Sequence, residues 1–200
     1  FKASVIKKKR DLLNTVKYLN SIDYYRASKC TVPEGRPDLW TIEEVRLLLG
    51  KSVCHLIDYV YERQLLNEGG SKQVTNDKIV GIRLIELAIA HCVYNTYACF
   101  EETVVKLPDE RIKKLLFELC MLYGIGNILA RPNYLAESSG IEPHHLESLR
   151  ARMQTLLKAL RPHVIGLVDG FGLPDSCLRS PLTTAAQPYE VPNTLSSGRT

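Results

Sequence analysis

The chain has 200 residues and a mass of 22.6 kDa, with 45% hydrophobic and 24% charged residues. This composition is ordinary for a globular domain, and it excludes a collagen-like or wholly disordered chain. The net charge is only +4, from 26 basic and 22 acidic residues, which does not match the dense basic surface of a nucleic-acid-binding domain. A chain of this size buries roughly 70% of its surface, so it can fold without metal or disulfide support.

The first predicted element is a helix over about Ser4 to Leu19, where apolar residues recur at helical spacing. The basic run Lys7 to Arg10 is interpreted as a solvated face of this helix, although a localisation signal or a phosphate-binding patch has the same composition. A connector rich in turn-forming residues follows, from Ser21 to Asp38. Residues 1–40 are therefore predicted to be an N-terminal helix and connector.

Two long helices are predicted next. Thr41-Ile-Glu-Glu44 has the pattern of a capping box, in which the Thr41 hydroxyl accepts the Glu44 N–H and the Glu44 carboxylate reaches back. A helix should follow to about Asn67. A second helix should run from about Asn76 to Lys106. Because its middle is apolar all round, we expect it to be the central helix of a bundle.

Two further helices complete the pattern. Pro108 is typical of a first helical turn, and the helix after it should end near Ala130. Its predicted buried face consists of Ile112, Leu115, Leu116, Leu119, Leu122 and Tyr123. Pro143 opens a last long helix, which Pro162 should break. Its predicted seam consists of Leu146, Leu149, Met153, Leu156, Leu157 and Leu160.

These elements predict an all-α fold: an antiparallel bundle of four to five long helices with a disordered C-terminal tail. The bundle is assigned to residues 41–179 and the flexible tail to residues 180–200, which are rich in Pro, Thr, Ser, Gly and Ala. The longest uncharged stretch, Leu87 to Phe100, is shorter than the about 20 residues of a membrane-spanning helix. No membrane span is therefore predicted.

The cysteines and histidines show no metal-site pattern. None of the six cysteines has C-x-x-C or zinc-finger spacing, so they are interpreted as free thiols of a reducing compartment. His91, in the most apolar helix, is interpreted as a hydrogen-bonded core residue, with a catalytic base as the alternative. His144 and His145 are predicted to be surface residues, because neighbours on a helix point about 100° apart and cannot easily share a metal.

Other motifs also point away from catalysis. Gly124-Ile-Gly126 is a fragment of a dinucleotide-binding motif, but it lies inside a helical pattern and does not follow a strand. These glycines are interpreted as allowing a neighbouring helix to approach closely. No nucleophile elbow, phosphate loop or zinc-protease motif is present. The residues alone therefore predict no catalytic, cofactor-binding or metal-binding residue, and they are typical of an interaction or support module.

One segment carries a resemblance to a known family. Leu160 to Phe171 reads Leu-Arg-Pro-His-Val-Ile-Gly-Leu-Val-Asp-Gly-Phe, and it resembles the C-terminal signature of the acyl-CoA oxidases. The signature continues at Pro174-Asp175, Leu178, Ser180 and Leu182, and weaker matches lie at Tyr18-Leu19, Ala90 to Cys92 and Leu119 to Tyr123. The resemblance covers the chain to about Glu190. Within the segment, Asp169 ends an apolar run, and we expect turn amides, Arg161 or Arg179 to bind its carboxylate, with an Asp169 that points into water as the alternative.

The resemblance implies the C-terminal helical domain of an FAD-dependent flavoprotein. Members of the family oxidise acyl-CoA to trans-2-enoyl-CoA, reduce O₂ to H₂O₂, work in peroxisomal fatty acid β-oxidation and are typically homodimers. Their flavin contacts and catalytic glutamate lie mostly upstream of this domain. The resemblance therefore implies FAD, fatty acyl-CoA and the upstream flavin domains as partners of the complete protein, whereas this chain alone should be inactive and bind no FAD.

The end of the chain departs from the family. Only Tyr189-Glu190 resembles the usual Val-Tyr-Glu, and the chain ends Gly198-Arg199-Thr200 and not in a Ser-Lys-Leu-type signal. A peroxisomal location therefore rests on the resemblance, with the cytoplasm as the alternative. Because the chain begins at Phe1, we expect it to be a piece of a longer polypeptide. The alternative function is a stand-alone helical scaffold or adaptor without enzymatic activity.

Overall fold

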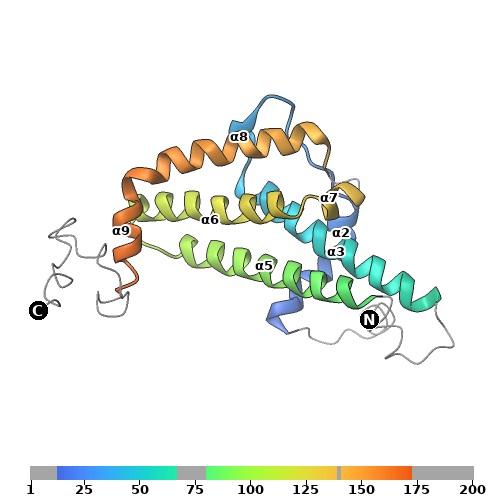
Figure 1. The fold of residues 1–200 in the computed structure, drawn as a ribbon. Helices are drawn as coiled ribbons and strands as arrows, with labels where there is room; N and C mark the ends of the chain where they lie inside the picture. The colour runs from blue at the N-terminus through green and yellow to red at the C-terminus, as the bar shows by residue number, and fades with distance from the viewer. Residues whose placement is uncertain (1–12, 67–79, 139–140, 173–200) are drawn as a thin grey trace, which may run out of the picture. The chain divides into compact units, whose positions relative to one another are not determined.

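The computed structural model describes residues 13–66, 80–138 and 141–172. Every regular element in these ranges is a helix (Figure 1), which confirms the all-α fold class. The long helices are α3 (Ile42–Leu66), α5 (Gly81–Val105), α6 (Glu110–Ala130) and α8 (Pro143–Leu160). None of the helices in the described ranges is long and apolar enough to cross a membrane. The predicted tail, residues 180–200, lies outside these ranges.

The chain divides into two compact units, Phe1–Leu160 and Arg161–Thr200. The first unit contains the four long helices. The second unit, described over residues 161–172, contains the short 3₁₀ helix η4 (Arg161–His163) and the short helix α9 (Val164–Asp169). The division into residues 1–40, 41–179 and 180–200 stays a prediction.

The N-terminal segment differs from the prediction. Residues 1–12 of the expected first helix lie outside the described ranges, and its remainder is the 3₁₀ helix η1 (Asn14–Ser21). The short helix α2 (Ile22–Ala27) then stands where a connector was predicted. Tyr25 of α2 is only 8% exposed, because its ring packs into the core. This burial outweighs the local turn-forming preference of Ser21 and Asp23.

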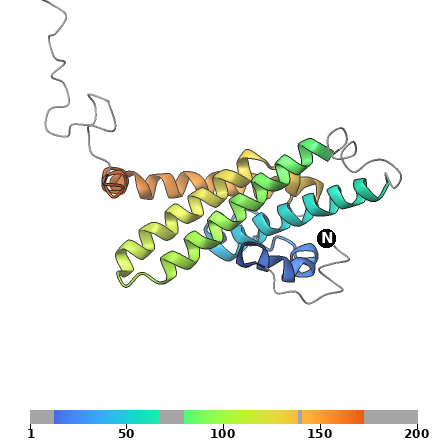
Figure 2. The ribbon, with the colours of Figure 1, turned by 90° about the horizontal axis from the view of Figure 1, so that it is seen from below.

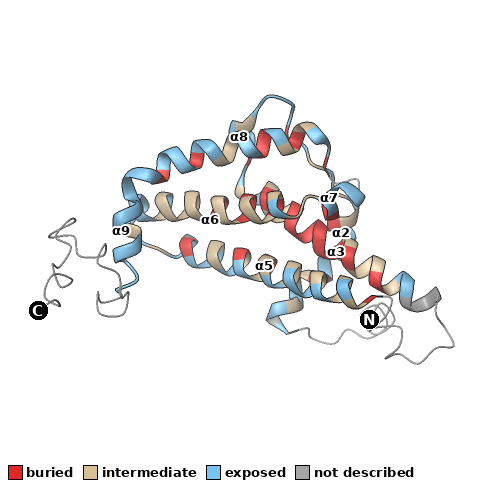
Figure 3. Ribbon diagram, viewed as in Figure 1, coloured by how far each residue is buried: buried red, intermediate tan, exposed pale blue. Residues whose placement is uncertain are grey.

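Helix α3, and not α5, is the central helix of the bundle. It packs against α2, α5, α6 and α7 (Asn133–Glu137), and its buried residues stand out in Figure 3. Its start follows the capping prediction in part. The Glu44 N–H donates to the Thr41 hydroxyl at 3.2 Å, but the Glu44 carboxylate accepts a 2.6 Å bond from the Thr31 hydroxyl and does not reach back.

Helices α5 and α6 form an antiparallel pair joined by a short turn, and α5 also lies against α3 (Figure 2). Asp109 caps α6 and accepts bonds from the N–H groups of Arg111 and Ile112 at 2.8 and 3.2 Å. The face predicted for α6 is only partly confirmed: Leu122 and Tyr123 are half-buried against the core, but Ile112 is 50% exposed. The residues that α6 buries are Cys120, Met121, Gly124, Ile125 and Ile128.

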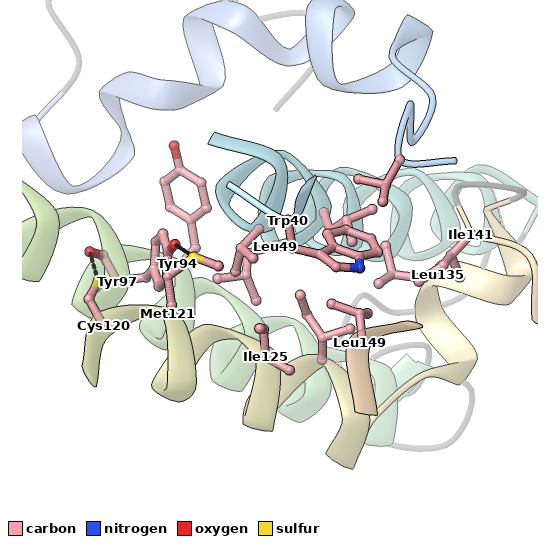
Figure 4. Packing of buried hydrophobic residues seen from close by; sticks show 14 of the residues in the cluster. Trp40, Leu49, Tyr94, Tyr97, Cys120, Met121, Ile125, Leu135, Ile141 and Leu149 are labelled. Carbon is pink, nitrogen blue, oxygen red and sulfur yellow. Dashed lines mark hydrogen bonds between the residues drawn. The ribbon is translucent and has the colours of Figure 1, made fainter. Parts of the chain in front are cut away.

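The remaining elements of the first unit follow the predicted order, with one addition. The short helix α7 was not predicted, and it buries Tyr134 and Leu135. Helix α8 begins at Pro143 and ends at Leu160, before Pro162, as predicted. Leu149 and Leu156 belong to its buried face, but Leu157 is 48% exposed. Trp40, in the connector before α3, packs beside Leu149 (Figure 4), and its indole N–H donates to the Ser148 hydroxyl at 2.9 Å.

Candidate functional site

The sequence singled out His91, which lies half-buried on α5. Its Nδ1 is 2.8 Å from the Tyr18 hydroxyl, and the Asn95 amide nitrogen is 3.1 Å from Nε2. Burial raises the pKa of the Tyr18 hydroxyl, so the phenol stays protonated at neutral pH and can donate to the ring. His91 was interpreted as a hydrogen-bonded core residue: the hydrogen bond is confirmed, but the ring is half-buried at the edge of the core, where the bond joins η1 to α5.

A second polar cluster fixes α2 on the central helix. The hydroxyls of Tyr25 and Tyr94 form a buried hydrogen bond of 2.7 Å. Lys51, only 6% exposed, donates to the carbonyls of Arg26 and Ser28 at 3.2 and 2.7 Å. These carbonyls lie at the C-terminal end of α2, where a cation is favoured. The sequence analysis missed Lys51, although a lysine between the apolar positions of α3 could have indicated a buried partner.

The prediction for His145 is wrong, because this residue is buried and not on the surface. Its Nδ1 accepts the Glu142 N–H at 3.0 Å, so the proton is assigned to Nε2, which lies 3.1 Å from the Val32 carbonyl. Burial lowers its pKa and favours the neutral ring. His144 is half-buried and lies 3.3 Å from the Glu142 carboxylate. Within the described ranges, no group of three or more His, Cys, Asp or Glu side chains is placed to hold a metal ion.

The cysteines separate into two kinds. Cys54 and Cys120 are buried, and burial raises the pKa of each thiol to about 12, which makes both unreactive at neutral pH. Cys92 and Cys99 are free and exposed on α5.

An open groove of about 370 Å³ lies beside Trp40, between α6 and α8. Apolar side chains in its wall are Trp40, Phe117, Met121 and Leu156. Charged side chains of both signs also line it: Lys113, Lys114, Arg152, Glu110 and Glu118. The groove is at the small end of the range for drug-sized ligands, and its three basic side chains outnumber its two carboxylates.

The groove beside Trp40 does not fit FAD. A flavin dinucleotide is larger than a drug-sized ligand, and the groove beside Trp40 is too small to enclose it. Helix N-termini commonly bind a pyrophosphate through free amides, but at α6 the Asp109 carboxylate already accepts two of these N–H groups. Gly124 packs against Tyr97 and Val45 and faces no ligand site.

The segment that carries the family signature lies in the second unit. Asp169 is exposed, and its carboxylate has no hydrogen-bond partner among residues 161–172, so the predicted contacts with turn amides of this segment and with Arg161 are wrong. Arg179 lies outside the described ranges. The apolar side chains of this segment are also exposed: Val164 by 49%, Ile165 by 76%, Val168 by 56% and Phe171 by 78%.

The fold thus defines a helical-bundle domain whose polar clusters join its helices to one another. The model of the family described as "Acyl-CoA oxidase" matches residues 41–185, which is well over half of the chain. The chain belongs to the acyl-CoA oxidase family.

The curated relatives are much longer than this chain. The chain is 31% identical over 104 residues to peroxisomal acyl-coenzyme A oxidase 1 of Rattus norvegicus, and the aligned region covers 52% of this chain and 16% of that protein. It is 27% identical over 175 residues to peroxisomal acyl-coenzyme A oxidase 2 of the same species, covering 86% of this chain and 25% of that protein. The chain therefore spans about a sixth to a quarter of these relatives.

Solved acyl-CoA oxidases share the fold. Acyl-CoA oxidase 3 of Yarrowia lipolytica has a TM-score of 0.77 at 19% identity, covering 89% of this chain and 25% of that one. Acyl-CoA oxidase 1 of Arabidopsis thaliana has a TM-score of 0.76 at 16% identity, covering 98% and 32%. Acyl-CoA oxidase-2 of Caenorhabditis elegans, solved with FAD, ascaroside-CoA and ATP, has a TM-score of 0.74 at 19% identity, covering 90% and 25%.

Proposed function

We propose that this chain is the C-terminal helical domain of an FAD-dependent acyl-CoA oxidase, and that it supports the upstream flavin domains without itself catalysing the reaction. The complete protein would convert an acyl-CoA and O₂ to the trans-2-enoyl-CoA and H₂O₂. It would act in fatty acid β-oxidation in peroxisomes, as a homodimer.

The family match over residues 41–185 carries this proposal. The matched region includes the whole Leu160–Phe171 signature. The curated relatives of this chain are named peroxisomal acyl-coenzyme A oxidases. FAD as the cofactor of the complete protein is supported by the Caenorhabditis elegans enzyme, whose solved structure holds FAD.

A supporting role, and not a catalytic one, follows from the polar groups of the described residues. The buried or half-buried polar side chains of His91, Tyr25 and Lys51 bind other parts of the same bundle. Such bonds stabilise the helix arrangement and satisfy these polar groups within the bundle. The groove beside Trp40 does not fit FAD, so the flavin would be bound by other residues of the complete protein.

The test is the mass and the absorbance of the complete polypeptide purified from its natural source. We expect a mass well above 22.6 kDa, stoichiometric flavin absorbance and H₂O₂ formation with an acyl-CoA. The 200-residue chain prepared alone should retain no flavin. A natural product of 22.6 kDa without flavin would contradict the proposal and favour a stand-alone helical scaffold, whereas stoichiometric flavin on the 200-residue chain would contradict the supporting role.

A further inference from the structure

The outer face of α5 carries a continuous apolar row. Seven exposed, uncharged residues lie between Ile82 and Cys99, and each has another of the seven three or four positions away, which places them on one side of the helix. Ile82 is 76% exposed, Ile85 63% and Ile89 37%. We call this row the outer stripe, and it consists of Ile82, Ile85, Ala88, Ile89, Cys92, Thr96 and Cys99.

The outer stripe contains no charged residue, although α5 has charges elsewhere. Arg83 binds Glu86 and Glu137 at 3.1 and 3.3 Å, and Glu101 lies 3.2 Å from Arg46 of α3. Arg83 and Glu101 are thus held beside neighbouring residues, whereas Glu102 is exposed one turn beyond Cys99, so the uncharged part of the outer face ends at Cys99. The exposed face of α8 is different, because it carries Glu147, Arg150, Gln154 and Lys158.

Single exposed apolar residues are common, but a contiguous apolar row marks an interaction surface. The stripe extends over 17 residue steps, or about 26 Å of helix, and a helix face is about 10 Å wide. Its area is therefore of the order of 300 Å². A stable association between two separate chains buries about 800 Å² on each partner, so the outer stripe alone is too small to hold a second copy of this chain.

A tethered partner needs less area, because a linker supplies an effective concentration in the millimolar range. Relatives of this chain have such a partner in the same polypeptide, since the matched region is only 16% to 25% of their length. We propose that the outer stripe of α5 is the surface through which this domain docks on the upstream part of its own polypeptide, against an uncharged apolar face. This inference rests on the proposed function and adds the place of contact.

Cys92 and Cys99 lie on the outer stripe. The rate at which a reagent modifies their thiols therefore shows whether a partner covers the stripe, and no mutation is needed. In the 200-residue chain, both thiols should react rapidly with a thiol reagent, at a rate independent of chain concentration. In the natively folded complete polypeptide, we expect each to react at least about tenfold more slowly, because the docked face must open first. Cys54 and Cys120 are internal controls that should stay slow in both samples.

A matched pair of variants separates docking from general destabilisation. In the complete polypeptide, Ile85→Lys should restore fast labelling of Cys92 and Cys99, because a lysine in an apolar contact is unfavourable. Leu157→Lys introduces the same charge at a position on α8 that is 48% exposed, and it should leave both thiols protected. In the 200-residue chain, neither variant should shift the melting temperature by more than about 2 °C, because both sites are exposed.

Flavin absorbance of the same complete polypeptide separates the two proposals. Fast labelling of Cys92 and Cys99 in a flavin-containing, folded protein would overturn the docking surface and leave the proposed function intact. Protected thiols in a protein without flavin or oxidase activity would overturn the proposed function alone. Protection that appears in the 200-residue chain as its concentration rises, together with a dimer in sedimentation, would overturn the tethered partner and assign the stripe to a second copy.

Discussion

Helices α3 and α5 have the same length, 25 residues each, but opposite places in the bundle. Helix α3 buries residues on most of its circumference, including the consecutive run from Leu48 to Cys54. Helix α5, whose sequence is more apolar, buries only Tyr94, Tyr97 and Val104 among its residues. The number of neighbours a helix has, and not its apolar content, therefore decides whether it is central.

The same comparison shows how a central helix tolerates polar residues. Lys51 and Ser52 lie in the buried run of α3, and each has a backbone carbonyl within hydrogen-bond distance: Ser28 at 2.7 Å for Lys51 and Leu48 at 3.1 Å for Ser52. A buried polar group with such a partner is compatible with the core. An apolar row without a neighbour, as on α5, is the more unusual feature of the two.

The largest expected loss of stability comes from a charge placed on α3, and the same charge on α5 is its control. Leu56 of α3 is fully buried and Ile85 of α5 is 63% exposed. In the 200-residue chain, Leu56→Asp should prevent folding or lower the free energy of unfolding by about 3–5 kcal/mol, because an unpaired carboxylate is buried. Ile85→Asp should change it by only about 0.5 kcal/mol. Denaturant unfolding followed by circular dichroism measures both.

If Leu56→Asp gives no soluble protein, Leu56→Ala keeps the comparison measurable. It should lower the free energy of unfolding by about 2–5 kcal/mol through the cavity that it leaves. A loss from Ile85→Asp as large as that from Leu56→Ala would contradict the peripheral position of the outer stripe.

The helix boundaries could be predicted from the sequence because they depend on local chemistry. Thr41 and Pro143 mark helix starts through a cap and a fixed backbone angle, and the structure places a helix at each. Pro108 was predicted to lie in the first turn of α6, but it precedes the helix, because Asp109 caps it and α6 begins at Glu110. The order of the helices in space could not be predicted in this way. It depends on contacts such as Gly124 against Val45, between residues far apart in the sequence.

The environments of the polar residues could be predicted only where they depend on local sequence, and not where they depend on distant contacts. His91 was predicted to be hydrogen-bonded, since a polar group in an apolar helix needs a partner, but the identity of that partner, Tyr18, required the fold. His145 was predicted to be exposed from its place in a first turn. It is buried because the Val32 segment, more than a hundred residues away, packs over it.

The two glycines of α6 offer a test of the contact that joins α3 to α5. A Cβ on Gly124 would lie 2.5 Å from both the Tyr97 ring of α5 and the Val45 side chain of α3, whereas a Cβ on Gly126 would meet nothing within 4 Å. Gly124→Ala should therefore destabilise the chain by about 1–3 kcal/mol through overpacking. Gly126→Ala is the matched control, and it should stabilise the chain by about 0.5–1 kcal/mol.

Thermal or denaturant unfolding of the two variants decides between these outcomes. Equal effects of the same sign would mean that α6 does not pack on α3 and α5 through Gly124. The near-ultraviolet circular dichroism of the Tyr97 ring is a second measurement. If Gly124 contacts the ring, Gly124→Ala should change this signal; if it does not, the signal should stay as in the wild type.

The inner side of α5 is tested by the hydroxyl pair of Tyr25 and Tyr94, which are 8% and 5% exposed. Tyr25→Phe or Tyr94→Phe should each lower the free energy of unfolding by about 1–2 kcal/mol, because the remaining hydroxyl keeps no partner. The double variant should lose clearly less than the sum of the two single losses, since no hydroxyl is then left unsatisfied. Additive losses in this double-mutant cycle would show that the two hydroxyls do not depend on each other.

The smallest expected effect concerns Glu101, which connects α5 to α3 through Arg46 at 3.2 Å. Burial raises the pKa of the Glu101 carboxyl above its ordinary value of 4.5, and the attraction of Arg46 only partly opposes this. Between 4.5 and the raised pKa, the folded chain binds more protons than the unfolded chain, so the contribution of Glu101 to stability falls as pH rises through this window.

Glu101→Gln removes this titration, so the stability of the wild type relative to Glu101→Gln should decrease as pH rises from 4.5. The change should stay below about 1 kcal/mol, as for other partly exposed ion pairs. Arg46→Gln should extend the decrease to higher pH, because it removes the attraction that opposes burial. Denaturant unfolding of the three proteins across this pH range measures the effect. A difference that grows in favour of the wild type with rising pH would mean that Arg46, and not burial, dominates at Glu101, and that α5 is held to α3 by charge as well as by packing.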